Sequence, residues 1–115
     1  MLRQLIPFLL FFFLANATAA ADLSGTVSWI YDGDTLLVEN IGKVRLLGID
    51  CPESQSGNRD RYYSSNFGIA PNRLRHIARE AKKFNITQVK GKQVRLEFDA
   101  EQQDRYGRTL AYVYL

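Results

Sequence analysis

The sequence contains one cysteine, Cys51, and one histidine, His76. A single thiol excludes an internal disulfide, so the fold must be held together by its core. A single histidine excludes a metal site built on two histidines and weakens any nuclease scheme that depends on that residue. The sequence also lacks an apolar run of the roughly 20 residues that a membrane-spanning helix requires.

The composition is that of one globular domain. The chain has 115 residues, of which 46% are hydrophobic and 23% are charged, without repeats, low-complexity tracts or an interdomain linker. Its formal charge of +3 is mildly basic. Such a charge is compatible with a polyanionic partner but does not require one.

The first 21 residues have the features of a bacterial signal peptide. Arg3 provides a positive start, residues 5–14 are apolar, and small residues follow with cleavage options after Ala19 or Ala21. The apolar run is short for a retained membrane anchor, which is the alternative interpretation. We therefore expect an exported protein, secreted or periplasmic, whose mature domain comprises residues 22–115.

The mature segment alternates with the period of β-strands. Strands are predicted at residues 25–31, 35–38, 43–49, 93–98 and 108–115, with the first three forming a meander. Residues 51–68 are polar and predict a long loop. A helix is predicted from Pro71 to about Phe84, and one face of it carries Leu74, Ile77, Ala78, Ala81 and Phe84.

This order predicts a mainly β (α+β) fold with one or two helices. Three strands, a helix and two further strands match a five-stranded antiparallel OB-fold barrel with the helix between strands three and four. The last strand stops at Leu115 without a cap or polar tail. We expect that C-terminal residues are missing.

Acidic and basic side chains gather where the predicted strands end. Asp34 and Asp50 offer the carboxylates that Ca²⁺ or Mg²⁺ prefers. Glu53 could guide an attacking water. Arg45 and Arg108 could stabilise charge on a phosphoryl group. Taken alone, the Asp-Gly-Asp segment at residues 32–34 is typical of an ordinary turn.

Three motifs together are more specific. They are YDGDT at residues 31–35, VRLLGIDCPE at 44–53 and DRYGRTLAY at 104–112. In this order they resemble the staphylococcal nuclease (thermonuclease) family, and the resemblance covers residues 24–115. It implies a secreted, monomeric, Ca²⁺-dependent endonuclease that hydrolyses DNA and RNA, preferably single-stranded, to give 3′-phosphate ends.

The resemblance also implies a role for each motif residue. The Ca²⁺ ligands would be Asp34, Asp50 and the backbone carbonyl of Cys51, with Asp32 near the metal but outside its first shell. The catalytic residues would be Arg45 and Arg108, which clamp the scissile phosphate, and Glu53, which acts as base or water-orienting group. Arg105 and Tyr106 would contact a neighbouring phosphate.

The sequence departs from the family pattern in three places. Cys51 stands where threonine is common, residues 54–92 are longer than in the smallest members, and the further C-terminal helices are not present. Two alternatives therefore stay open. One is a catalytically silent OB-fold module, or inactive fragment, that binds nucleic acid or protein; the other is a Cys51 nucleophile with His76 as its base.

Overall fold

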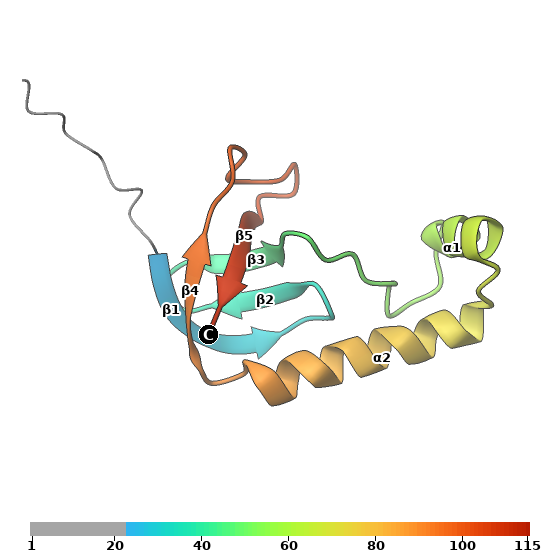
Figure 1. The fold of residues 1–115 in the computed structure, drawn as a ribbon, viewed down its shortest axis with the longest axis horizontal. Helices are drawn as coiled ribbons and strands as arrows, with labels where there is room; N and C mark the ends of the chain where they lie inside the picture. Colours follow the sequence, from blue (N-terminus) through green and yellow to red (C-terminus); the bar gives the residue numbers. More distant parts are fainter. Residues whose placement is uncertain (1–22) are drawn as a thin grey trace, which may run out of the picture.

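The computed structural model describes residues 23–115, so the predicted signal peptide lies outside the described part of the chain. Five strands close into a barrel in the order β1-β2-β3-β5-β4 (Figure 1). They are β1 (Leu23–Ile30), β2 (Thr35–Val38), β3 (Gly42–Leu46), β4 (Gln93–Glu97) and β5 (Thr109–Tyr114). The predicted five-stranded, mainly β barrel is confirmed.

The strand directions differ from the prediction at one junction. Four pairings are antiparallel, whereas β3 and β5 pair in parallel, with Arg45 opposite Leu110. A closed ring with an odd number of strands cannot alternate direction all the way round. One parallel pair is therefore required, and the long connection between β3 and β5 permits it.

The barrel interior is filled by apolar side chains from all five strands. In β4 the alternation is clear, because Val94 and Leu96 point inward while their neighbours are exposed. The buried core consists of Val27, Ile30, Leu36, Val38, Val44, Leu46, Val94, Leu96 and Ala111. Strand β3 ends at Leu46, earlier than predicted, so the segment from residue 47 to 50 is free to form the rim of the barrel.

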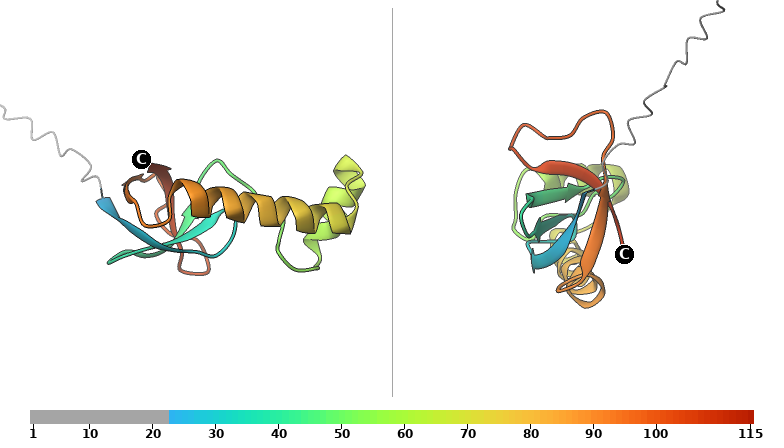
Figure 2. Two further views of the ribbon diagram at one scale, coloured as in Figure 1. Left: turned by 90° about the horizontal axis from the view of Figure 1, so that it is seen from below. Right: turned by 90° about the vertical axis from the view of Figure 1, so that its left-hand side faces the viewer.

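Two helices lie between β3 and β4. Helix α2 (Pro71–Gln88) begins where Pro71 predicted, because proline is suited to the first turn. Figure 2 shows its C-terminal part beside the barrel and its N-terminal part extending beyond it towards α1. The prediction for Phe84 is wrong: its side chain is 64% exposed, and Asn85 is buried instead. No helix within residues 23–115 is both long and apolar enough to cross a membrane.

Helix α1 (Arg59–Phe67) corrects the predicted loop at residues 51–68. The helix has a polar sequence, and none of its residues is buried. An amphipathic pattern, which would have indicated a helix, is therefore absent. Gly68 ends the helix in the left-handed conformation that glycine adopts easily.

Candidate functional site

The turn between β1 and β2 is fixed from three directions. The backbone N–H of Asp34 donates to Asp32 Oδ1 at 2.9 Å. The buried Asn85 amide of α2 donates to the carbonyls of Asp32 and Gly33 at 3.3 and 2.9 Å. A Cβ on Gly33 would lie 2.4 Å from Cys51 Sγ, so only glycine fits there. The turn therefore presents Asp34 in one defined orientation.

Asp34 is a buried carboxylate with partners on both oxygens. Its Oδ1 accepts a hydrogen bond from Thr35 Oγ1 at 3.1 Å, and its Oδ2 accepts one from the Cys51 N–H at 3.2 Å. Burial raises the pKa of Asp34, and neighbouring Asp32 raises it further. The Cys51 N–H and Arg45 oppose this shift without cancelling it. A nearby cation would relieve this unfavourable buried negative charge.

Arg45 joins the two acids that the sequence assigned to a metal. Its Nη2 lies 3.4 Å from Asp34 Oδ2 and 3.3 Å from Asp50 Oδ1. Its Nη1 donates to the carbonyls of Leu46 and Ile49, both at 2.6 Å. The backbone thus holds the guanidinium in place, and Asp34 and Asp50 converge on one of its nitrogens.

Arg108 reaches the same rim from the start of β5. Its Nη1 donates to Thr35 Oγ1 at 3.3 Å, and Thr35 in turn donates to Asp34. Its Nε donates to Asp104 Oδ2 at 2.7 Å. Burial would raise the pKa of Asp104, but hydrogen bonds from Arg108 and from the Tyr106 N–H outweigh it and lower the pKa. Asp104 therefore positions Arg108 as an ionised partner.

Three arginines line one pocket of about 340 Å³. Its lining includes the side chains of Arg45, Arg105, Tyr106 and Arg108. The guanidinium carbons of Arg105 and Arg108 lie 4.9 and 5.6 Å from the centroid of the Tyr106 ring. Guanidinium groups at one pocket suit a phosphate, because each can donate two parallel hydrogen bonds.

The third predicted acid, Glu53, is exposed and contacts α1. Its Oε1 lies 3.6 Å from Arg59 Nη1, while Arg59 Nη2 donates to Asp50 Oδ2 at 2.6 Å. The Tyr63 hydroxyl donates to the same Asp50 oxygen at 3.4 Å. The Arg59 hydrogen bond lowers the pKa of Asp50 against the effect of burial, and the charges of Arg59 and Arg45 add to the lowering.

Arg59, Tyr63 and Asn85 were not predicted from the sequence to belong to the site. Arg59 and Tyr63 fall in the segment interpreted as a loop, and no motif marks either one. Asn85 lies four residues after Ala81 and seven after Ala78, on the same helix face, so its position was marked by the periodicity but its polar character hid it. Only the tertiary contacts reveal all three.

The alternative of a cysteine nucleophile is disfavoured. Burial and four surrounding acids raise the pKa of the Cys51 thiol to about 11, so it is protonated at neutral pH. His76 lies exposed on α2. The predicted role of the Cys51 backbone carbonyl as a metal ligand stays a prediction.

The donor chemistry of the acids fits a hard divalent cation. Asp34 and Asp50 offer carboxylate oxygens on either side of Arg45, and Asp32 adds a carboxylate beside Asp34. Among residues 23–115, no three His, Cys, Asp or Glu side chains are grouped closely enough to hold an ion by themselves. Backbone oxygens and water would therefore have to complete the coordination of Ca²⁺.

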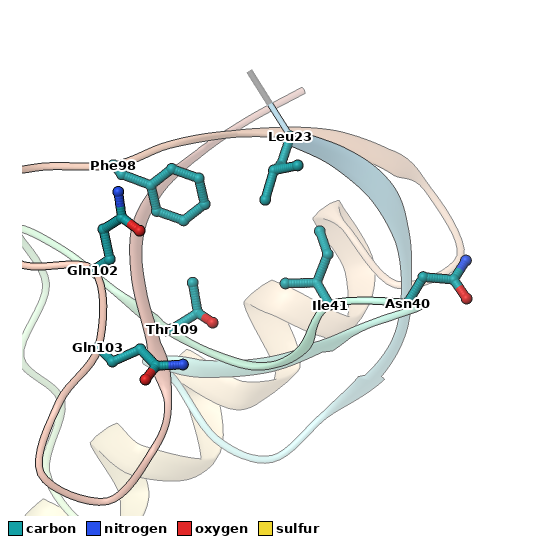
Figure 3. A pocket seen from close by; sticks show the side chains of 7 residues that line it. All are labelled: Leu23, Asn40, Ile41, Phe98, Gln102, Gln103 and Thr109. Atoms are coloured by element: carbon teal, nitrogen blue, oxygen red, sulfur yellow. The ribbon is translucent and has the colours of Figure 1, made fainter. Parts of the chain in front are cut away.

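A second hollow, of about 480 Å³, lies at a different part of the barrel (Figure 3). Leu23, Ile41 and Phe98 point towards its centre, while Asn40 points away. Gln102, Gln103 and Thr109 complete the lining contributed by residues 23–115, which includes no charged side chain. Without a cation or a carboxylate, this hollow is not suited to phosphate chemistry.

The comparisons with known proteins find nucleases among the similar chains. The protein-family model described as "Staphylococcal nuclease homologue" matches residues 43–115. The chain is 34% identical to a thermonuclease of Staphylococcus hyicus over 104 residues, which are 88% of this chain and 54% of the relative. It is 34% identical to a thermonuclease of Staphylococcus intermedius over 106 residues, 90% of this chain and 55% of the relative. The endonuclease YncB of Bacillus subtilis is also 34% identical, over 78% of this chain and 38% of the relative. The chain thus spans about half the length of the two thermonucleases.

Proposed function

This chain belongs to the staphylococcal nuclease homologue family, and from that premise we propose that it is a Ca²⁺-dependent nuclease cutting DNA and RNA. The relatives named as thermonucleases and endonucleases support the nuclease assignment. The structural support is one arrangement of side chains. Asp34 and Asp50 converge on Arg45, and Arg108 is linked to Asp34 through Thr35. Acidic and arginine side chains on a single rim can act on the same phosphate group.

The acids would hold the cation. In the proposal Asp34 and Asp50 are its side-chain ligands, the Cys51 carbonyl is a further ligand, and Asp32 orients Asp34 from outside the first shell. A bound Ca²⁺ supplies Lewis-acid polarisation of a phosphoryl oxygen.

The arginines and Glu53 would carry out the remaining chemistry. Arg45 and Arg108 donate to the phosphoryl oxygens, whose negative charge increases as phosphorus becomes five-coordinate. Glu53 takes a proton from the attacking water or orients it. The water oxygen bonds to phosphorus, the bond from phosphorus to the 5′ oxygen breaks, and the 5′ oxygen takes up a proton from solvent water, so the phosphate stays on the 3′ end. Arg105 and Tyr106 contact an adjacent phosphate from the same pocket.

The proposed setting of the enzyme rests on the predicted signal peptide. We propose that residues 1–21 direct export, so that the domain acts outside the cytoplasm as a monomer. Single-stranded DNA and RNA are the proposed preferred substrates, since a strand free of a duplex can reach an open rim.

The test is digestion of single-stranded DNA and RNA by the full chain with Ca²⁺, with a chelator, and with Ca²⁺ restored. We expect cleavage only when Ca²⁺ is present and fragments that carry a 3′-phosphate. Arg61→Ala, on the exposed surface of α1, is the matched control for Arg108→Ala. Full activity under chelation would remove the metal from the proposal. Calcium-independent binding without cleavage would favour the silent module.

A further inference from the structure

Helix α1 is attached to the rest of the protein by polar contacts. None of its residues is buried. The rings of Tyr62, Tyr63 and Phe67 pack against one another, with centroids 5.4 to 6.4 Å apart. One ion pair, Asp60 to Arg75 at 2.5 Å, ties the helix to α2. A helix held in this way can move without exposing a hydrophobic core.

The N-terminal end of α1 lies against the acids of the proposed site. Arg59 spans two of them, with Nη2 2.6 Å from Asp50 Oδ2 and Nη1 3.6 Å from Glu53 Oε1. Arg45 holds the other Asp50 oxygen at 3.3 Å. Both Asp50 oxygens are therefore engaged by guanidinium groups, although Asp50 is a proposed ligand of the cation.

The two arginines differ in how firmly they are held. The Arg45 side chain is 19% exposed and donates to two backbone carbonyls, so the barrel fixes it. The Arg59 side chain is 42% exposed, and it contacts the side chains of Asp50, Glu53 and Tyr63. Arg59 is thus the guanidinium that can leave Asp50 at a small cost, because exposed ion pairs are weak.

We propose that α1 is a displaceable latch, in which Arg59 pairs with Glu53 and occupies the place on Asp50 that a divalent cation takes. This inference rests on the proposed function. A divalent cation that takes Asp50 Oδ2 as a ligand needs the oxygen that Arg59 occupies at 2.6 Å, so the cation and the Arg59 guanidinium compete for it. Only the fraction of molecules with the latch open then binds the cation, which lowers the apparent affinity by that fraction.

The first test is calorimetric titration of Ca²⁺ into the full chain and its variant Arg59→Gln. The variant lacks the competing charge, so we expect its affinity for Ca²⁺ to rise about two- to five-fold, the range an exposed ion pair supports. Arg61→Gln removes the same charge from an exposed position of α1 and should change the affinity less than Arg59→Gln. Equal or weaker Ca²⁺ binding by Arg59→Gln overturns the latch, as does an equal gain in both variants.

The second test is amide hydrogen exchange of the wild-type chain with and without Ca²⁺. The latch predicts faster exchange in α1 when Ca²⁺ is bound and little change in the part of α2 beside the barrel. Unchanged or slower exchange in α1 overturns the latch, because a general charge effect would not release the helix. Circular dichroism melting confirms that each variant is folded.

The outcomes separate the latch from the proposed function. If the wild-type chain binds Ca²⁺ and cuts DNA, but Arg59→Gln behaves like it, only the latch fails. If neither protein binds Ca²⁺, the metal-dependent function fails and the latch fails with it. Binding by Arg59→Gln alone would show a latch that is fully closed in the wild type.

Discussion

Replacing Gly33 with alanine should disrupt the turn that presents Asp34. The added Cβ would lie 2.4 Å from Cys51 Sγ, 2.6 Å from Ala81 Cβ and 3.1 Å from Cys51 Cβ. These distances are too short for carbon and sulfur, so the turn or α2 must shift. Overpacking of this kind costs about 1–3 kcal/mol. For a domain of this size each kcal/mol lowers the melting temperature by roughly 4–8 °C.

The assay is thermal unfolding followed by circular dichroism, with the rate of DNA cleavage measured in parallel. The double variant Gly33→Ala with Cys51→Ala removes the nearest clashing atom but leaves Ala81 in place. We therefore expect it to be more stable than the sum of the two single changes by about 0.5 kcal/mol or more. A wild-type melting temperature for Gly33→Ala, or strict additivity in the double variant, would refute the packing argument.

Three further predictions concern the site. Glu53→Gln and Arg108→Ala should each lower the cleavage rate by about 10²- to 10³-fold, and unchanged rates would defeat both assignments. The melting temperature should be kept in Glu53→Gln and lowered in Arg108→Ala, because Asp104 loses its side-chain partner. Asn85→Ala should cost about 1–3 kcal/mol in urea unfolding, because the Gly33 carbonyl loses its buried donor; a loss below the error of the assay would contradict this. The pKa of Asp104 is lower in the folded state than the ordinary 3.8, so its stabilising effect is present at neutral pH and is lost as the pH falls below that value. Asp104→Asn should therefore have a lower free energy of unfolding than the wild type at pH 7 and should lose less of it as the pH is lowered. An equal loss of unfolding free energy in the variant and the wild type would contradict the prediction.

Much of the barrel could be predicted from local patterns. Alternation located all five strands, and β2 was predicted with the observed bounds. The predicted ends of β1 and β3 were wrong, because apolar residues such as Ile49 follow the last residue that pairs with a neighbouring strand. The parallel pairing of β3 with β5 depends on closure of the whole ring, which no local pattern contains.

The arrangement of the site was predicted in part. The structure places Asp34, Asp50, Arg45 and Arg108 on one rim, as expected when acids and arginines stand at the ends of neighbouring strands. Their chemical roles stay predictions. Helix α1 was missed because helix formation there does not depend on a buried face.

Contacts that link distant parts of the chain were beyond the sequence analysis. Asn85 reaches the turn at Gly33 from 52 residues away, and Arg59 pairs with Asp50 through a segment without a recognisable signal. The Asn85 contact arises from the packing of α2 beside the barrel, whereas Arg59 reaches Asp50 by an ion pair from a helix with no buried residue. Such contacts can be identified only when the complete fold is known, because no local sequence pattern marks them.

The most direct measurement is calorimetric Ca²⁺ binding to Asp34→Asn and Asp50→Asn, beside the control Asp99→Asn on the loop after β4. If the two carboxylates share one ion, each site variant should lose about ten-fold or more in affinity, since even changes to residues that only support a metal ligand cost that much. Asp99→Asn should bind as the wild type does. Wild-type affinity in either Asp34→Asn or Asp50→Asn would contradict a shared cation site on this rim.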